Sequence, residues 1–109
     1  MSIEDTNVVD AIGVETATGD VVLTIADHLD WEDEGGHLLL LQEKLNAYLR
    51  FIESGEMNQT YPEAENRRVV INVIGRYPLS EHAMKVFDQA IATLNSAGIG
   101  LRSELFEGD

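Results

Sequence analysis

The sequence predicts an α+β domain, a two-layer sandwich in the order ββαβαβ, with a four-stranded mixed sheet and two helices on one face. Three observations favour this fold. Residues 8–14 and 20–27 are β-branched runs separated by a short loop that contains Gly. Residues 38–52 and 83–94 repeat apolar side chains at intervals of three and four, as amphipathic helices do. Residues 67–77 form a nearly continuous apolar run between them.

The first two runs are expected to form a β-hairpin, because a short Gly-containing loop joins two segments of high β propensity. In the second run Val21, Leu23 and Ile25 alternate with smaller or more polar residues. Side chains two apart share one face of a strand, so these three are predicted to face the core.

The helix over 38–52 carries an apolar arc too wide for a sheet alone to cover, because Leu40 and Phe51 lie on a flank beside the main stripe. Either the second helix or a second copy of the protein would have to pack there. We expect the second helix, and we keep self-association through Leu40 and Phe51 as the alternative.

The second half continues the pattern. A connecting loop is expected over 56–66, followed by an inner strand that Pro78 ends. Ser80 is a suitable N-cap for the second helix, and Gly98 is expected to stop it in the left-handed conformation. Residues 101–106 read as a short polar strand at an edge of the sheet.

A chain of 109 residues corresponds to one domain, with residues 1–7 expected to be disordered and 107–109 frayed. The chain has no cysteine, which excludes disulfides, thiolate metal sites and a cysteine nucleophile. The amino terminus lacks the basic region of a signal peptide, so a cytoplasmic location is expected.

The charge is strongly asymmetric. Residues 1–65 hold 15 acidic residues against two basic ones, for a net charge of −13, whereas residues 66–109 hold five of each. Such a charge repels nucleic acids and anionic membranes, so neither is an expected partner. A basic protein surface is compatible with it, and so is the simpler role of keeping the chain soluble.

An acidic segment with the single tryptophan directly precedes the first helix. An aromatic residue ringed by charge is typical of a contact point for a basic partner. The predicted partner-binding residues are Asp27, Asp30, Trp31, Glu32, Asp33 and Glu34. Structural roles compete with this interpretation: Asp30 or Asp33 can cap the helix, and Trp31 can close the core over Leu38.

A metal-assisted hydrolase is the rival hypothesis for the same segment. Its carboxylates and imidazoles are candidate ligands, namely Asp27, His28, Asp30 and His37. Their spacing matches neither the His-x-x-x-His pattern of a zinc helix nor a calcium loop. We therefore predict no metal and no cofactor, with His28 and His37 as the weak candidates.

The chain shows no nucleophile motif and no acid–base pair, so no catalytic residue is predicted and the expectation leans against an enzyme. A non-enzymatic binding or accessory module, monomeric or homodimeric, is the predicted function.

Several segments of the chain are distinctive, namely DHLDWEDE and HLLLLQEKLNAYL, followed by FIESGE, YPEA and RRVVINV. Through them the chain resembles a small bacterial protein family of unknown function over residues 8–106. The resemblance implies a bacterial cytosolic α+β domain. It brings no catalytic residues.

Overall fold

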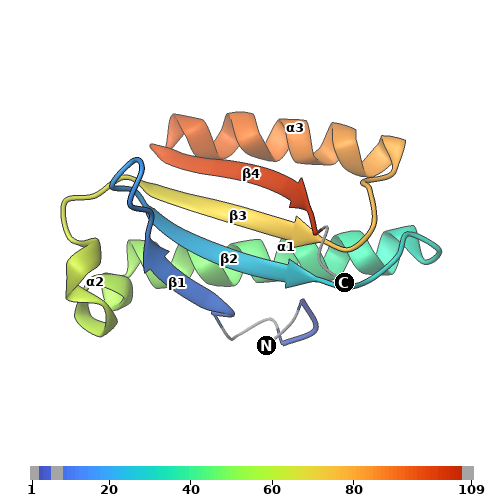
Figure 1. The fold of residues 1–109 in the computed structure, drawn as a ribbon. Helices are drawn as coiled ribbons and strands as arrows, with labels where there is room; N and C mark the ends of the chain where they lie inside the picture. The colour runs from blue at the N-terminus through green and yellow to red at the C-terminus, as the bar shows by residue number, and fades with distance from the viewer. Residues whose placement is uncertain (1–2, 6–8, 107–109) are drawn as a thin grey trace.

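The computed structural model describes residues 3–5 and 9–106, and it confirms the predicted fold (Figure 1). Four strands form one sheet in the spatial order β1-β2-β3-β4. The first pair is antiparallel, and the other two pairs are parallel. The strands are β1 (Ala11–Val14), β2 (Val21–Asp27), β3 (Val69–Gly75) and β4 (Ile99–Leu105).

The two long helices, α1 (Glu34–Glu53) and α3 (Glu81–Ser96), lie on the same face of the sheet (Figure 1). Each crosses over between neighbouring parallel strands, and successive right-handed crossovers in one direction place their helices on one side. Ser80 caps α3 as expected, since its Oγ accepts the Ala83 N–H at 3.1 Å. Gly98, which follows the helix, has a φ of 81°. Among the described residues no helix has both the length and the apolar character that crossing a membrane requires.

The core lies between the sheet and the helices. Val21, Leu23 and Ile25 of β2 are fully buried there, as their alternation predicts. The neighbouring strands contribute Val69, Ile71, Val73, Ile99 and Leu101. Within residues 3–5 and 9–106, no helix covers the opposite face of the sheet (Figure 1).

The most deeply buried stripe of α1 differs from the one that the apolar pattern indicates. It consists of His37, Leu41, Lys44 and Tyr48. These four positions share one side of a helix; Leu41 and Tyr48 belong to the predicted apolar face, whereas the apolar spacing does not select His37 or Lys44. Leu45, Leu49 and Ile52 of the predicted apolar face lie beside this stripe and are half-buried against the core.

The segment 56–66, expected to be a connecting loop, instead contains the short helix α2 (Glu56–Thr60) and a 3₁₀ turn, η1 (Pro62–Ala64). The expectation was wrong because this segment has core residues of its own, Met57 and Ala64, both buried. A helical turn satisfies the backbone groups while it directs these side chains inward.

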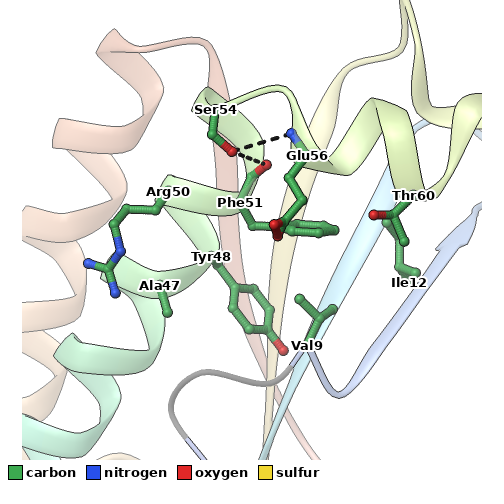
Figure 2. Close-up of a pocket in the computed structure, with 9 residues that line it drawn as sticks. All are labelled: Val9, Ile12, Ala47, Tyr48, Arg50, Phe51, Ser54, Glu56 and Thr60. Carbon is green, nitrogen blue, oxygen red and sulfur yellow. Dashed lines mark hydrogen bonds between the residues drawn. The ribbon is translucent and has the colours of Figure 1, made fainter.

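The flank of α1 that carries Leu40 and Phe51 packs in part against the chain's own core. Both residues are half-buried and pack against the core cluster. Phe51 lines a cavity of about 480 Å³ together with Val9 and Ile12 (Figure 2). The second helix, which we expected on this flank, packs over β4 instead.

The amino-terminal expectation of disorder over 1–7 does not hold for Ile3, which is fully buried. Its N–H donates to the Ala26 carbonyl at 3.0 Å, which continues the pairing along the end of β2. Residues 1–2 and 6–7, and residues 107–109 for which fraying was expected, lie outside the described residues.

A buried polar network joins α1 to β2 and the chain before β1. Lys44 is fully buried, and its Nζ donates to Asp10 Oδ1 at 2.9 Å. The Tyr48 hydroxyl donates to the Thr24 carbonyl at 2.6 Å and accepts the Asp10 N–H at 2.8 Å. These bonds replace the hydrogen bonds that the Asp10, Lys44 and Tyr48 side chains would make with water. They thereby offset the free-energy cost of burying the three side chains.

Burial raises the pKa of the Tyr48 phenol well above its usual range. An unfolded tyrosine ionises near pH 10. Because the folded pKa is higher, the contribution of Tyr48 to stability is complete below about pH 10 and is lost as the pH rises above it. We therefore expect Tyr48→Phe to flatten the decline of the free energy of unfolding above about pH 10, as measured by urea unfolding at a series of pH values. The exposed Tyr77→Phe is the matched control, and equal slopes in the two variants would contradict the assignment.

Candidate functional site

The carboxyl ends of the three parallel strands meet at one edge of the sheet. The register aligns Asp27, Gly75 and Leu105, the last residues of β2, β3 and β4. Open sheets with parallel strands commonly bind ligands at this edge, because the loops that leave it can form a crevice. The acidic segment leaves this edge directly after Asp27.

A buried carboxylate–imidazole pair lies at this edge. Asp27 Oδ2 and His37 Nε2 are 2.6 Å apart, and the two side chains are 4% and 2% exposed. The other oxygen, Oδ1, accepts the Leu29 N–H at 3.2 Å. The pair ties the first turn of α1 to the end of β2.

The contacts of His37 determine where its hydrogens lie. Nδ1 is 2.8 Å from the Asp30 carbonyl oxygen, which can only accept, so Nδ1 carries a hydrogen. Nε2 faces Asp27 Oδ2 at 2.6 Å. Both ring nitrogens are engaged within the chain, which leaves neither to bind a metal or to remove a proton from a substrate.

The indole of Trp31 is half-buried, and its ring stacks on His37 with centroids 3.6 Å apart and planes inclined by 17°. The structural role that competed with partner binding in the sequence placed Trp31 over Leu38, but its ring contact is with the imidazole. The indole N–H is buried and has no hydrogen-bond partner within the described residues. Trp31 thus covers the Asp27–His37 pair and exposes only part of its surface.

The exposed acids of the segment also organise the local backbone. Asp33 is the N-cap of α1, with Oδ1 accepting the Gly36 N–H at 3.2 Å. Asp30 Oδ1 accepts the Glu32 N–H at 3.1 Å. Asp30, Glu32 and Asp33 are exposed, so their charges face solvent. Asp30 and Asp33 accept their hydrogen bonds from the backbone at the same time.

Two other predicted partner-binding residues, Glu34 and Asp27, are less accessible to a partner. Glu34 is half-buried and accepts a hydrogen bond from the Ser80 hydroxyl at 2.5 Å, which joins the starts of α1 and α3. Asp27 lies beneath the surface with His37, so a partner would meet it only inside a cavity.

The metal hypothesis gains no support from the geometry. His28 is exposed and lies 3.4 Å from Glu4, whereas His37 is buried with both nitrogens occupied. Across residues 3–5 and 9–106, no three His, Asp or Glu side chains are grouped as a metal ion would require.

An apolar cluster that the sequence did not predict lies at the same edge. Tyr77, Met84, Leu105 and Phe106 are each 46–48% exposed although they are large and apolar. Tyr77 follows β3, Met84 lies in the first turn of α3, Leu105 ends β4 and Phe106 follows it. Tyr77, Met84 and Leu105 line one hollow, whereas Phe106 lines another. The sequence does show two apolar residues, Leu105 and Phe106, at the end of a polar strand. Nothing in the sequence indicates that they lie near Met84.

Two hollows adjoin this cluster, and Asp27 lines both. The larger, of about 380 Å³, is lined by Tyr77, Met84, Leu105 and their neighbours. The smaller, of about 200 Å³, lies between His28, Arg76 and Phe106. The edge therefore combines exposed apolar side chains, hollows and nearby carboxylates.

The chain matches one family model over residues 1–107, described as a family of unknown function, DUF6572. This match confirms the resemblance to a family of unknown function. No curated protein and no solved structure matches the chain.

Proposed function

Since the chain belongs to DUF6572, a family of unknown function, we propose from its own residues that it is a non-enzymatic protein-binding module. Its contact surface is the edge surface, defined as Tyr77, Met84, Leu105 and Phe106 with the adjoining acidic loop 28–34. The partner presents basic and apolar side chains to this surface. The cytoplasmic, bacterial setting expected from the sequence remains a prediction.

The observation that carries the proposal is the gathering of exposed apolar side chains at the acidic end of the sheet. Tyr77, Met84 and Leu105 line one cavity, and Phe106 follows Leu105 directly. Single exposed apolar residues are ordinary, but a cluster rimmed by polar groups is typical of a contact site. Aromatic residues and Met are also enriched in the centres of protein interfaces.

Electrostatics favours a basic partner. Asp30, Glu32 and Asp33 are exposed in the loop that follows β2 at this edge of the sheet, within residues 1–65, which carry a net charge of −13. Charges at the rim of an interface mainly accelerate encounter and select the partner's sign, whereas buried apolar anchors slow dissociation. The edge surface has both components.

The structure favours this interpretation over an enzyme or a homodimer built on the flank of α1. His37 has no free ring nitrogen for acid–base chemistry. Leu40 and Phe51 already pack against their own core, which reduces what a second copy could bury there.

The proposal is tested by capture from a bacterial lysate on immobilised protein, with elution by a salt gradient and comparison of matched variants. Met84→Glu is expected to weaken capture at least tenfold, because it places an unpaired charge in the centre of the interface. Asp30→Asn with Glu32→Gln is expected to lower the salt concentration of elution, because rim charges are removed.

The control is Ala17→Glu, which adds the same charge to an exposed residue of the β1–β2 turn, at the opposite end of the sheet. It should leave capture unchanged. If Met84→Glu and Ala17→Glu retain the same partner equally, the edge surface is not the contact surface.

A further inference from the structure

We propose that the partner adds an extended segment as a fifth strand along the outer side of β4, with every second side chain in the hollow between β4 and α3. This inference rests on the proposed function and names the form in which the partner binds. β4 is the outermost strand on one side of the sheet, and β1 is the outermost on the other (Figure 1). An unpaired strand at the side of a sheet can accept a strand from another chain.

The outer side of β4 presents backbone groups that no strand satisfies. The Phe106 N–H donates to the Gly75 carbonyl at 2.7 Å, and the backbone groups of a strand alternate in direction from one residue to the next. Arg102 and Glu104 therefore also direct their backbone groups at β3, in agreement with the register of the two strands. Within residues 3–5 and 9–106 no strand adjoins the opposite side of β4. The residues that direct their N–H and C=O groups to this side are Leu101, Ser103 and Leu105.

Of the two outermost strands, β4 is the better template for an added strand. It has seven residues against four in β1, contains no proline, and is exposed over residues 102–105. Proteins commonly protect a side strand by shortening it or by placing proline in it. β4 has neither feature, so its outer side can pair over several consecutive residues.

A hollow of about 390 Å³ follows this side of β4. Leu101 and Ser103, which face α3, line it together with Arg102, which faces the open side of the sheet. None of the described residues of β3 lines it, so the hollow lies at the outer side of the strand. Its apolar walls are Leu79, Met84, Phe87, Ile91 and Leu101. An added strand would direct every second side chain at these walls.

The charges beside the hollow favour a basic segment. Asp88 lines the hollow, and Glu104 is exposed on the open face of β4. Glu104 accepts from Asn72 through Oε1 at 3.1 Å, and a carboxylate can accept about four hydrogen bonds. Arg102 is the basic residue of the lining, and its Nη2 already donates to Glu15 at 3.0 Å. A basic residue opposite Glu104 therefore forms a favourable cross-strand pair.

These contacts specify an alternating segment. In an antiparallel pair, residues opposite Leu101, Ser103 and Leu105 direct their backbone groups at β4 and their side chains toward α3, so apolar residues fit there. Residues opposite Arg102 and Glu104 lie on the open face, and the one opposite Glu104 should be basic. The expected order in the partner is apolar, basic, apolar, polar, apolar.

The experiment titrates the full chain with the acetylated and amidated peptide Val-Lys-Val-Thr-Val and follows the amide resonances. Binding is expected to shift the amides of Leu101, Ser103 and Leu105 and to slow their hydrogen exchange. The amides of Arg102 and Glu104 should be protected by β3 with or without peptide. Glutamate in place of the peptide's lysine should weaken binding about fivefold, because it places like charges opposite each other.

N-methylated peptides separate strand addition from binding through side chains alone. A methyl group on the nitrogen of the central valine blocks a bond to β4 and should weaken binding at least tenfold. A methyl group on the nitrogen of the lysine, which points away from β4, should leave the affinity nearly unchanged.

Ser103→Pro is the corresponding change in the protein. It removes an outward N–H without loss of a bond to β3, so the fold should persist in circular dichroism while peptide binding falls at least tenfold. Ser103→Thr, the control, should bind as the native chain does. If the proline prevents folding, the two N-methylated peptides still decide the question.

Equal affinities of the two N-methylated peptides, or shifts that spare β4, would overturn the added-strand assignment. Its failure is distinguishable from that of the proposed function. If Ser103→Pro keeps the lysate partner that Met84→Glu loses, the added-strand inference is wrong and the edge surface stands. If the peptides bind as expected while Met84→Glu keeps the lysate partner, the proposed function is wrong and the outer side of β4 is a peptide site in its own right.

Discussion

Replacing Asp10 with asparagine is expected to lower the free energy of unfolding by about 3–5 kcal/mol, the range found when one member of a buried ion pair is removed. Lys44 is fully buried, and Asp10 Oδ1 lies 2.9 Å from its Nζ. The substitution keeps a side-chain oxygen that can accept the Ala26 N–H, a bond of 2.9 Å in the native chain. The loss therefore reports mainly a buried ammonium without its carboxylate partner, while the Asp5 carbonyl still accepts from Nζ at 2.8 Å. Urea unfolding monitored by circular dichroism measures it.

Lys44→Met combined with Asp10→Asn is the informative control. Replacing a buried charged pair with groups that need no counter-charge is often nearly neutral, so the double variant should recover most of the stability that Asp10→Asn loses. The two substitutions are therefore expected to be strongly non-additive. Additive losses would show that the two side chains stabilise the fold independently, contrary to the pairing described here.

Replacing Asp27 with alanine is expected to destabilise the fold by about 3 kcal/mol, because it leaves His37 Nε2 and the Leu29 N–H without their buried partner. For a domain of about 100 residues, each 1 kcal/mol corresponds to roughly 4–8 °C in Tm, so Tm should fall by more than about 10 °C. Differential scanning calorimetry measures this change. Trp31 emission should also shift, because the indole stacks on the affected imidazole.

Asp30→Ala is the matched control for Asp27→Ala. Asp30 has the same side chain three positions along the chain, but it is exposed. Its stability change should stay within about 1 kcal/mol, since it loses one exposed hydrogen bond to the Glu32 backbone. Equal losses in the two variants would contradict the distinction between the buried and the exposed acids of this segment.

The fold could be predicted because its elements carry strong local patterns. The alternation of Val21, Leu23 and Ile25 indicates a half-covered strand, and the caps at Ser80 and Gly98 delimit α3. The strand order could not be predicted, because it depends on which faces the crossover helices cover. The short helix α2 was missed because five residues show no helical period.

The buried stripe of α1 shows where pattern reasoning fails. His37 and Lys44 are not among the core residues that the apolar spacing of α1 predicts, yet both are buried. Their partners, Asp27 and Asp10, are 10 and 34 positions away in sequence, so no local spacing indicates the pairs. When the tertiary structure places a partner beside an ionisable side chain, their interaction offsets the free-energy cost of burying it.

The candidate site was predicted in part. The acidic segment identified from the sequence does lie at the edge where the parallel strands end, but Asp27 is buried rather than exposed. The apolar cluster was not predicted, because Tyr77, Met84 and Leu105 come from three elements. They meet only through the parallel register of β3 with β4 and the packing of α3 on β4.

Site-specific photo-crosslinking tests the central claim, that the edge surface contacts a protein partner, most directly. A photoreactive phenylalanine analogue placed at Phe106, and separately at Ala17 in the opposite turn, is activated in lysate and the adducts are identified by mass spectrometry. The account predicts one basic protein attached at position 106, absent at position 17 and lost when Met84→Glu is added. Adducts of the same protein at both positions, or at position 17 alone, would contradict it.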